Sequence, residues 1–149
     1  KETNISKGGL LYHFPTKFML LKGLIDDWIE EFNDRQTKYL VKDDKPGGWT
    51  RSYISANLRS QGAKKLSSGR LGIALLAATA YDQKLLAPLV EEMEKRQGNL
   101  ESDGIDKNVA NVVRLAVDGI WMNEMLGINV LSSEELKGVI KVLKDMTKE

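Results

Sequence analysis

Apolar residues recur at intervals of three and four positions through most of this chain, and that spacing limits the fold more than any other feature. The clearest stripe lies within residues 17–40 and consists of Leu21, Leu24, Ile25, Trp28, Ile29 and Phe32. Such a period places all of these side chains on one face of an α-helix. The segment therefore predicts one long helix whose apolar face packs into a core.

Five further segments are predicted to be helical on the same ground, and no segment shows a convincing strand pattern. Their expected ranges are 49–66, 71–81, 85–98, 107–127 and 133–147. Ser132 and Glu135 have the spacing of a capping box before the last of them. Loops are predicted at 42–48 and 99–106, where charged or polar residues are joined by glycine. The predicted fold class is all-α, a helical bundle of about six helices behind a short N-terminal helix.

Composition excludes several kinds of site. The 149 residues contain no cysteine and one histidine, so no disulfide, thiolate metal site or histidine-cluster metal site is possible. No apolar run approaches the ~20 residues that cross a bilayer, and the first residues do not resemble a signal peptide. We therefore expect a soluble, cytoplasmic protein, large enough to bury a core, with no metal and no cofactor.

The first residues predict a short helix with unusual residue types. Ser6 can cap it by accepting a backbone N–H bond, and Pro15 ends it because the residue before a proline avoids helical dihedrals. Gly8 and Gly9 occupy its first turn, where each costs up to ~1 kcal/mol relative to alanine. Glycine in that place allows the backbone to approach another surface closely.

The order of residues in this short helix resembles the recognition helix of TetR-family transcriptional regulators. Ile5-Ser6-Lys7-Gly8, Tyr12-His13-Phe14 and Lys17 fill the family pattern in register. Phe18 is a departure, because the family often has an acidic residue there, which suits a helix N-terminus. The resemblance implies an all-helical protein in which a helix-turn-helix head is joined to a helical body by the long helix over residues 17–40.

The resemblance also implies that this region contacts operator DNA. The expected DNA-binding residues are Ser6, Lys7, Gly8, Gly9, Leu10, Tyr12, His13 and Lys17. Residues 1–22 carry four lysines against one glutamate, although the whole chain has a net charge of only +1. Lys7 and Lys17 are expected to meet phosphates, and Gly8, Gly9 and Leu10 to lie nearest the bases. Ordinary solvated surface lysines are the alternative.

In the TetR family two helices normally precede the recognition helix, and no residues are present before Lys1 to form them. We therefore expect a helix-turn-helix head that lacks its first helices over residues 1–22. Residues 23–149 are expected to form the ligand-binding and dimerisation domain. The sequence leaves open whether the preceding helices are absent or only disordered.

The resemblance assigns the homodimer interface to the last two helices, residues 107–127 and 133–147. The first of these fits that role, because its apolar stripe is too wide for a single packing seam. Two buried faces are therefore expected, one against the bundle and one against a partner chain.

Large aromatic and methionine side chains lie on the helices that the resemblance places around the family's effector pocket. With polar residues that could complete such a site, the expected ligand-binding residues are Trp49, Tyr53, Asn57, Met93, Asp118, Trp121, Met122 and Met125. Asn123 and Glu124 are further polar candidates. An ordinary core with methionine as filler is the alternative, and the identity of the effector cannot be inferred from these residues.

The resemblance thus implies a dimeric transcriptional regulator, a repressor rather than an activator, that a small-molecule effector releases from operator DNA. The alternative is a helical ligand-binding or scaffold protein with no DNA function. An enzyme is not expected, because the sequence has no metal-ligand spacing, glycine-rich phosphate loop or GxSxG motif. His13 has no serine, cysteine or paired carboxylate placed by the sequence to act with it.

Overall fold

A computed structural model describes residues 12–58, 72, 80, 82–128 and 130–148. These residues form helices and contain no strand, which confirms the predicted all-α class. The helices are α2 (Lys17–Leu40), α3 (Gly48–Asn57), the short 3₁₀ helix η1 (Gln83–Leu86), α5 (Ala87–Glu101), α6 (Lys107–Leu126) and α7 (Ser133–Asp145). Within the described ranges, no helix is long and apolar enough to cross a membrane.

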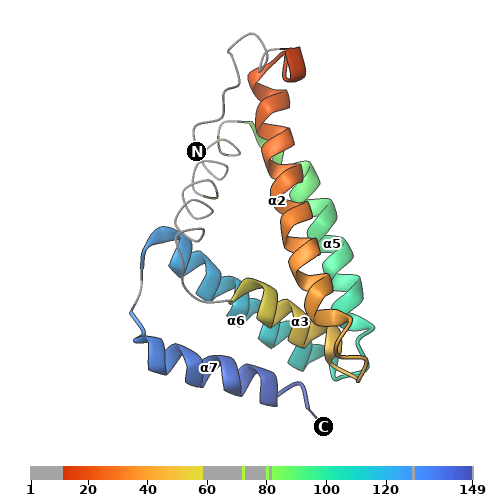
Figure 1. Ribbon diagram of the computed structural model, residues 1–149, viewed down its shortest axis with the longest axis vertical. Helices are drawn as coiled ribbons and strands as arrows, with labels where there is room; N and C mark the ends of the chain where they lie inside the picture. Colours follow the sequence, from red (N-terminus) through yellow and green to blue (C-terminus); the bar gives the residue numbers. More distant parts are fainter. Residues whose placement is uncertain (1–11, 59–71, 73–79, 81, 129, 149) are drawn as a thin grey trace.

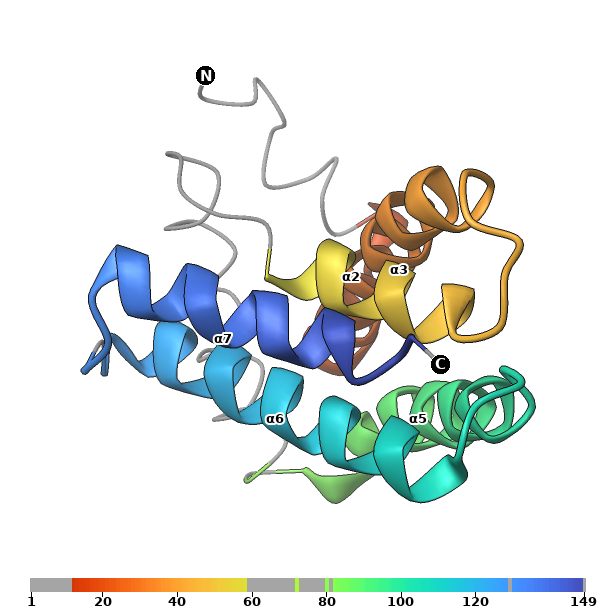
Figure 2. The same cartoon turned by 90° about the horizontal axis from the view of Figure 1, so that it is seen from below.

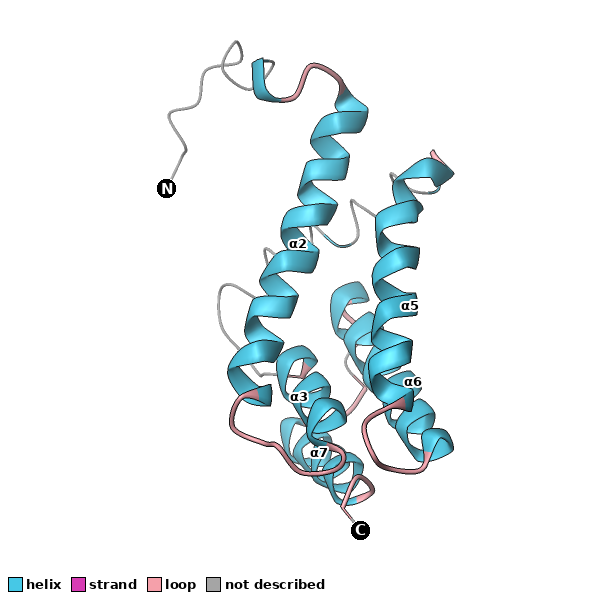
Figure 3. Cartoon of the chain, turned by 90° about the vertical axis from the view of Figure 1, so that its right-hand side faces the viewer, coloured by secondary structure: helices cyan, strands magenta, loops and turns pink. Residues whose placement is uncertain are grey.

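Helices α2 and α5 lie side by side along the long axis of the molecule, and α3, α6 and α7 gather at one end (Figure 1). Helix α3 is central to that end, because it contacts α2, α5, α6 and α7. Helix α7 lies on the outside of α3 and α6 (Figure 2). Figure 3 shows that the opposite end of α2 extends away from this group of helices toward the N-terminal residues.

The main core joins α2, α3, α6 and α7. Its buried residues are Phe32, Tyr53, Ile54, Ala56, Leu58, Val113, Val117 and Leu143. A smaller apolar cluster packs Ile25 of α2 against Leu85 of η1, with Leu21, Leu24 and Ile29 around them. Each fully buried side chain of this size stabilises the fold by roughly 1.5–3 kcal/mol. The predicted apolar stripe of residues 17–40 is therefore confirmed as the core-facing side of α2.

Several predicted helix ends are confirmed by their capping bonds. The Thr16 side chain accepts the backbone N–H of Met19 at 3.1 Å, so α2 begins at Lys17. Ser132 and Glu135 form the capping box of α7, with each side chain accepting the other residue's backbone N–H. Pro88 lies in the first turn of α5, where it displaces no intrahelical hydrogen bond.

The predicted end of α5 is wrong, because the helix continues through Gly98 to Glu101. Leu100 is fully buried, and its burial outweighs the helix penalty of about 1 kcal/mol that Gly98 imposes. Helix α3 ends at Asn57, earlier than predicted, and residues 59–66 of that prediction lie outside the described residues. Of the predicted helix 71–81, only Gly72 and Ala80 are described, and both are helical.

A glycine-containing corner between α2 and α3 fixes the position of α3. A methyl group built on Gly47, whose φ is +78°, would lie 2.5 Å from the carbonyl oxygen of Thr147, so only glycine allows this approach. Arg51 donates two hydrogen bonds to the carboxylate of Asp43, at 2.7 and 2.8 Å, and a third to the Thr147 carbonyl at 2.9 Å. The Arg51 guanidinium lowers the pKa of the Asp43 carboxyl, so this bidentate ion pair persists well below neutral pH.

Candidate functional site

Three of the predicted DNA-binding residues lie at the free end of α2. Tyr12 and His13 are helical and exposed, and Pro15 follows them before α2 begins at Lys17 (Figure 1). The two rings meet edge to face, with centroids 5.4 Å apart. The other five predicted residues, Ser6, Lys7, Gly8, Gly9 and Leu10, lie outside the described residues.

Phe14 joins this short helical segment to α2. Its ring lies so close to Gly23 that a methyl group built on that glycine would be 2.7 Å from the Phe14 ring. Phe14 is half-buried, whereas its neighbours Tyr12 and His13 are exposed. The contact orients the end of the preceding helix relative to α2, so a movement of α2 would carry Tyr12 and His13 with it.

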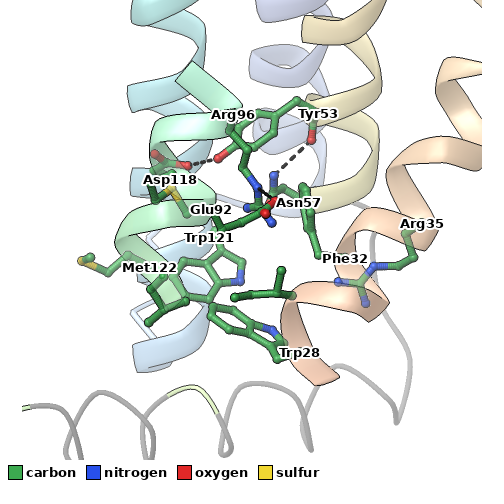
Figure 4. Close-up of a pocket in the computed structure, with 13 residues that line it drawn as sticks. Trp28, Phe32, Arg35, Tyr53, Asn57, Glu92, Arg96, Asp118, Trp121 and Met122 are labelled. Carbon is green, nitrogen blue, oxygen red and sulfur yellow. Dashed lines mark hydrogen bonds and ion pairs between the residues drawn. The ribbon is translucent and has the colours of Figure 1, made fainter. Parts of the chain in front are cut away.

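A cavity of about 230 Å³ lies between α2, α3, α5 and α6 (Figure 4). The described residues that line it are Trp28, Ile29, Phe32, Arg35, Tyr53, Asn57, Leu89, Glu92, Met93, Arg96, Asp118, Trp121 and Met122. Apolar and aromatic side chains predominate, and a few polar groups converge among them, which is the usual composition of a small-molecule site.

Aromatic rings from different helices form one wall of the cavity. Trp28 of α2 and Trp121 of α6 are stacked, with centroids 5.4 Å apart and planes inclined by 29°. The rings of Phe32 and Tyr53 meet edge to face at 5.7 Å. These flat surfaces come from segments far apart in the sequence, and the packing of α2 against α3 and α6 brings them together.

Tyr53 and Asp118 form the polar side of the cavity. The Tyr53 hydroxyl donates a short hydrogen bond to the carboxylate of Asp118, which also accepts one from Arg114 at 3.2 Å. Burial of the ring, with the Asp118 carboxylate beside it, raises the pKa of the Tyr53 phenol. Tyr53 therefore stays neutral at physiological pH and remains a hydrogen-bond donor to Asp118.

Two arginines line the cavity with different degrees of pairing. Arg96 is 6% exposed, donates from Nε to Glu92 at 2.9 Å, and lies 3.9 Å from the centre of the Phe32 ring. Arg35 donates from Nη1 to Glu31 at 3.3 Å, but its Nε is buried and has no acceptor among the described residues. Figure 4 shows Arg35 pointing from α2 toward Phe32.

The structure brings six of the eight predicted ligand-binding residues together around this cavity: Tyr53, Asn57, Met93, Asp118, Trp121 and Met122. Two do not line it. Trp49 stacks on Tyr53, with centroids 5.7 Å apart, and packs against the main core. Met125 is buried, and its sulfur lies close to Gly72.

Seven lining residues were not predicted as site residues: Trp28, Ile29, Phe32, Arg35, Leu89, Glu92 and Arg96. The α5 members carry a signal in the sequence, because Leu89, Met93 and Arg96 share one helix face and Glu92 precedes Arg96 by four positions. Arg35 carries a comparable signal, because Glu31 precedes it by four positions and it shares a helix face with Trp28 and Phe32. In the described part of the chain, no group of three or more histidine, aspartate or glutamate side chains could hold a metal ion.

The fold and the site together define a class: an all-α protein with a largely apolar cavity between its helices and an exposed helical segment at the far end of α2. Residues 47–148 match the family described as tetracyclin repressor-like, C-terminal domain, which is more than half of the chain. The chain therefore belongs to the TetR family of transcriptional regulators. Comparisons with curated proteins and with solved structures give no significant match.

Proposed function

We propose that the protein is a DNA-binding transcriptional repressor, acting in the cytoplasm, that a small-molecule effector releases from its operator. The observation that carries this proposal is that a single helix, α2, connects the ligand cavity with the proposed DNA-binding segment. Helix α2 lines the cavity through Trp28 and Phe32, and it begins at Lys17, directly after the segment that contains Tyr12 and His13. Family membership and this arrangement support a regulator rather than an isolated binding module or an enzyme.

In the proposed mechanism the cavity and the DNA-binding end are coupled through α2. A ligand can shift the protein away from its DNA-binding form only by binding the other form more tightly. Contact between the ligand and Trp28 and Phe32 gives the two forms different affinities for the ligand if α2 tilts between them. The Phe14 contact with Gly23 then transmits the tilt to the head. Two heads that fit half-sites ~34 Å apart in one form would no longer do so in the other.

The DNA contacts proposed for residues 1–22 follow the resemblance. Lys7 and Lys17 meet phosphates, Gly8, Gly9 and Leu10 lie nearest the bases, and Ser6, Tyr12 and His13 complete the surface. Residues 23–149 form the ligand-binding and dimerisation domain in this proposal. Tyr12, 83% exposed at the end of its helix, supports a contact role for this end of the molecule.

The proposal is tested with the complete gene product and operator fragments selected from genomic DNA. Lys17→Ala is expected to weaken operator binding about equally for all sequences, because a phosphate contact carries no base information. The slope of log K against log salt should fall in magnitude by about 0.9 for each phosphate that is no longer neutralised. Lys38→Ala, which removes an exposed lysine near the other end of α2, is the matched control and should leave the slope unchanged.

No sequence-selective retention of DNA by the complete protein would contradict the proposal and favour the helical ligand-binding or scaffold alternative. An unchanged salt slope in Lys17→Ala would contradict the proposed phosphate contact of Lys17, but not the proposal that the protein binds operator DNA. Both measurements can be made by fluorescence anisotropy with a labelled operator.

A homodimer through α6 and α7 is part of the proposal. Helix α6 has an outward stripe at three- and four-residue spacing, formed by Val112, Leu115, Gly119, Met122 and Leu126. The four apolar side chains are each 48–60% exposed, and α7 adds Val142 and Met146 at 58% and 41%. An apolar surface of this kind is typical of an interface, and it agrees with the second buried face expected for residues 107–127.

Leu115→Glu is expected to dissociate this dimer, because two glutamates would be placed against the partner's apolar stripe at a two-fold interface. The dimer Kd should rise roughly 30-fold or more, as for a buried interface residue. Val90→Glu, at an exposed valine of α5 that is 52% exposed, is the control and should leave the Kd unchanged. Analytical ultracentrifugation measures both, and a Leu115→Glu protein that remains dimeric would place the interface elsewhere.

A further inference from the structure

Among the described residues, the cavity wall contains a buried hydrogen-bond donor that has no acceptor, and this donor indicates the charge of the ligand. Each arginine guanidinium offers five N–H donors. The Nε of Arg96 donates a hydrogen bond to Glu92, and the Nη2 of Arg96 lies 3.5 Å from the Asn33 side-chain oxygen. Within the described ranges, Arg35 donates from Nη1 to Glu31 and its buried Nε has no acceptor. A buried donor without an acceptor is unfavourable, so a ligand that supplies an acceptor there gains binding energy.

The carboxylates of the cavity are already engaged. Glu92 accepts from Arg96 at 2.9 Å, and Asp118 accepts from both Tyr53 and Arg114. Each of these carboxylates therefore already has a partner, whereas the buried Nε of Arg35 has none among the described residues. The Phe32 ring face, which could otherwise attract a cation, is covered by the Arg96 guanidinium at 3.9 Å. The unpaired donor of Arg35 therefore favours an anionic ligand over a cationic one.

The shape of the cavity limits the rest of the ligand. A volume of about 230 Å³ is smaller than that of sites for drug-sized molecules, which begin at roughly 300 Å³. The stacked indoles of Trp28 and Trp121, with Ile29, Leu89 and Met122, offer flat and apolar contact surface. A flat ring system that stacks on an indole gains more from such a wall than a flexible chain of equal size, because it loses less conformational entropy.

We propose that the ligand of this cavity is a one- or two-ring aromatic carboxylate, with its ring beside Trp28 and Trp121 and its carboxylate accepting hydrogen bonds from the Arg35 guanidinium. Arg96, which contacts Glu92 and Phe32, is a further cationic group of the wall and adds to the attraction for the anion. The inference rests on the proposed function only in treating this ligand as the effector, since binding itself requires no DNA.

The first test compares probes of the same shape and different charge by calorimetry on the 149-residue chain. The probes are 2-naphthoate, 2-naphthamide and 2-(aminomethyl)naphthalene, with benzoate and benzamide as the one-ring pair. In at least one of the two pairs, naphthoate with naphthamide or benzoate with benzamide, the carboxylate is expected to bind roughly 10- to 100-fold more tightly than the amide. A charge-assisted hydrogen bond gives a difference of this size. The ammonium probe should bind most weakly.

The second test uses Arg35→Met, which removes the donors and retains an apolar stem. It is expected to abolish the preference for the carboxylate while leaving the affinity of the amide within about twofold. Lys38→Met on the same helix, exposed and outside the lining, is the matched control for loss of one positive charge and should retain the preference. Circular dichroism checks that both variants are folded. If a variant does not fold, the comparison of probes on the wild-type protein still tests the inference.

Four outcomes would overturn the inference: equal binding of carboxylate and amide, tighter binding of the ammonium probe, no binding of either carboxylate at millimolar concentration, or a preference that survives Arg35→Met. Its failure is distinguishable from failure of the proposed function. If a neutral or cationic molecule released the operator, the repressor proposal would hold and the carboxylate proposal would be contradicted. If the protein bound the carboxylate but never bound operator DNA, the carboxylate proposal would hold and the repressor proposal would be contradicted.

Discussion

Arg96→Met is expected to lower the free energy of unfolding by about 3–5 kcal/mol, the cost of removing one partner from a buried ion pair. The side chains of Arg96 and Glu92 are only 8% and 11% exposed, and their atoms meet at 2.9 Å. Methionine fills much of the same space but leaves the Glu92 carboxylate buried without its counter-ion. The substitution also removes the guanidinium from the face of Phe32, a residue of the main core. Urea denaturation followed by circular dichroism measures the loss.

A double-mutant comparison separates the buried charge from simple loss of packing. Arg96→Met combined with Glu92→Leu removes both charges, so it should recover most of the lost stability. Lys22→Met is the control for an exposed pair of the same i,i+4 spacing, because Lys22 and Asp26 are each nearly half exposed. It should cost no more than about 1 kcal/mol. An Arg96→Met protein as stable as the Lys22→Met protein would mean that water reaches Glu92 and replaces the arginine.

Local signals in the sequence were sufficient to predict the described α-helices and most of their ends, but not the 3₁₀ helix η1. Ser132 caps α7 as expected, and Thr16 caps α2 in the same way, because a side-chain oxygen at an N-cap acts within three residues. The end of α5 could not be predicted in this way. Gly98 is a local signal for stopping, and burial of Leu100 against other helices overrides it, which no window of neighbouring residues can reveal.

The residues of the cavity also divide into those that local sequence could predict and those that depend on how the helices pack. Tyr53 and Trp121 were predicted as ligand-binding residues from their type and helix, and they do line the cavity. Trp49 has the same chemistry as Trp121 and stacks one turn away from Tyr53, but it packs in the core. Residue type does not tell which side of a helix faces a cavity and which faces the core. That depends on how the helices pack.

The unpredicted part of the cavity depends on contacts between residues far apart in the chain. Trp28 and Trp121 stack across two helices, and Arg96 covers Phe32 from a third. Arg35 shares the apolar face of α2 with Trp28 and Phe32 by its spacing, but its pairing with Glu31, four positions before it, is typical of a surface arginine. Only the position of α2 against the rest of the bundle buries its Nε and makes it a candidate for ligand binding.

Asp103→Ala is expected to lower the free energy of unfolding by about 2–4 kcal/mol, the second large effect that the structure predicts. The Asp103 carboxylate accepts the backbone N–H groups of Trp49 and Thr50, at 2.9 and 2.7 Å, and the Thr50 hydroxyl at 2.6 Å. It caps the N-terminus of α3 from another part of the chain, because Gly47 at the N-cap position has no side chain to do so. Thr50 is fully buried, so water cannot replace the missing acceptor easily.

Two comparisons test whether this cap is what holds α3 in place. Asp103→Asn keeps one acceptor oxygen and should cost less than Asp103→Ala, because the charge is lost but a hydrogen bond remains. Asp106→Ala removes the exposed cap of α6, which accepts N–H groups at 2.8 and 3.1 Å, and should cost only about 1 kcal/mol. If Asp103→Ala were as mild as Asp106→Ala, the corner formed by Gly47 and Arg51 would be sufficient to fix α3 alone. A loss near the expected value would instead make the α5–α6 loop a support of the cavity, since α3 carries Tyr53 and Asn57 into it.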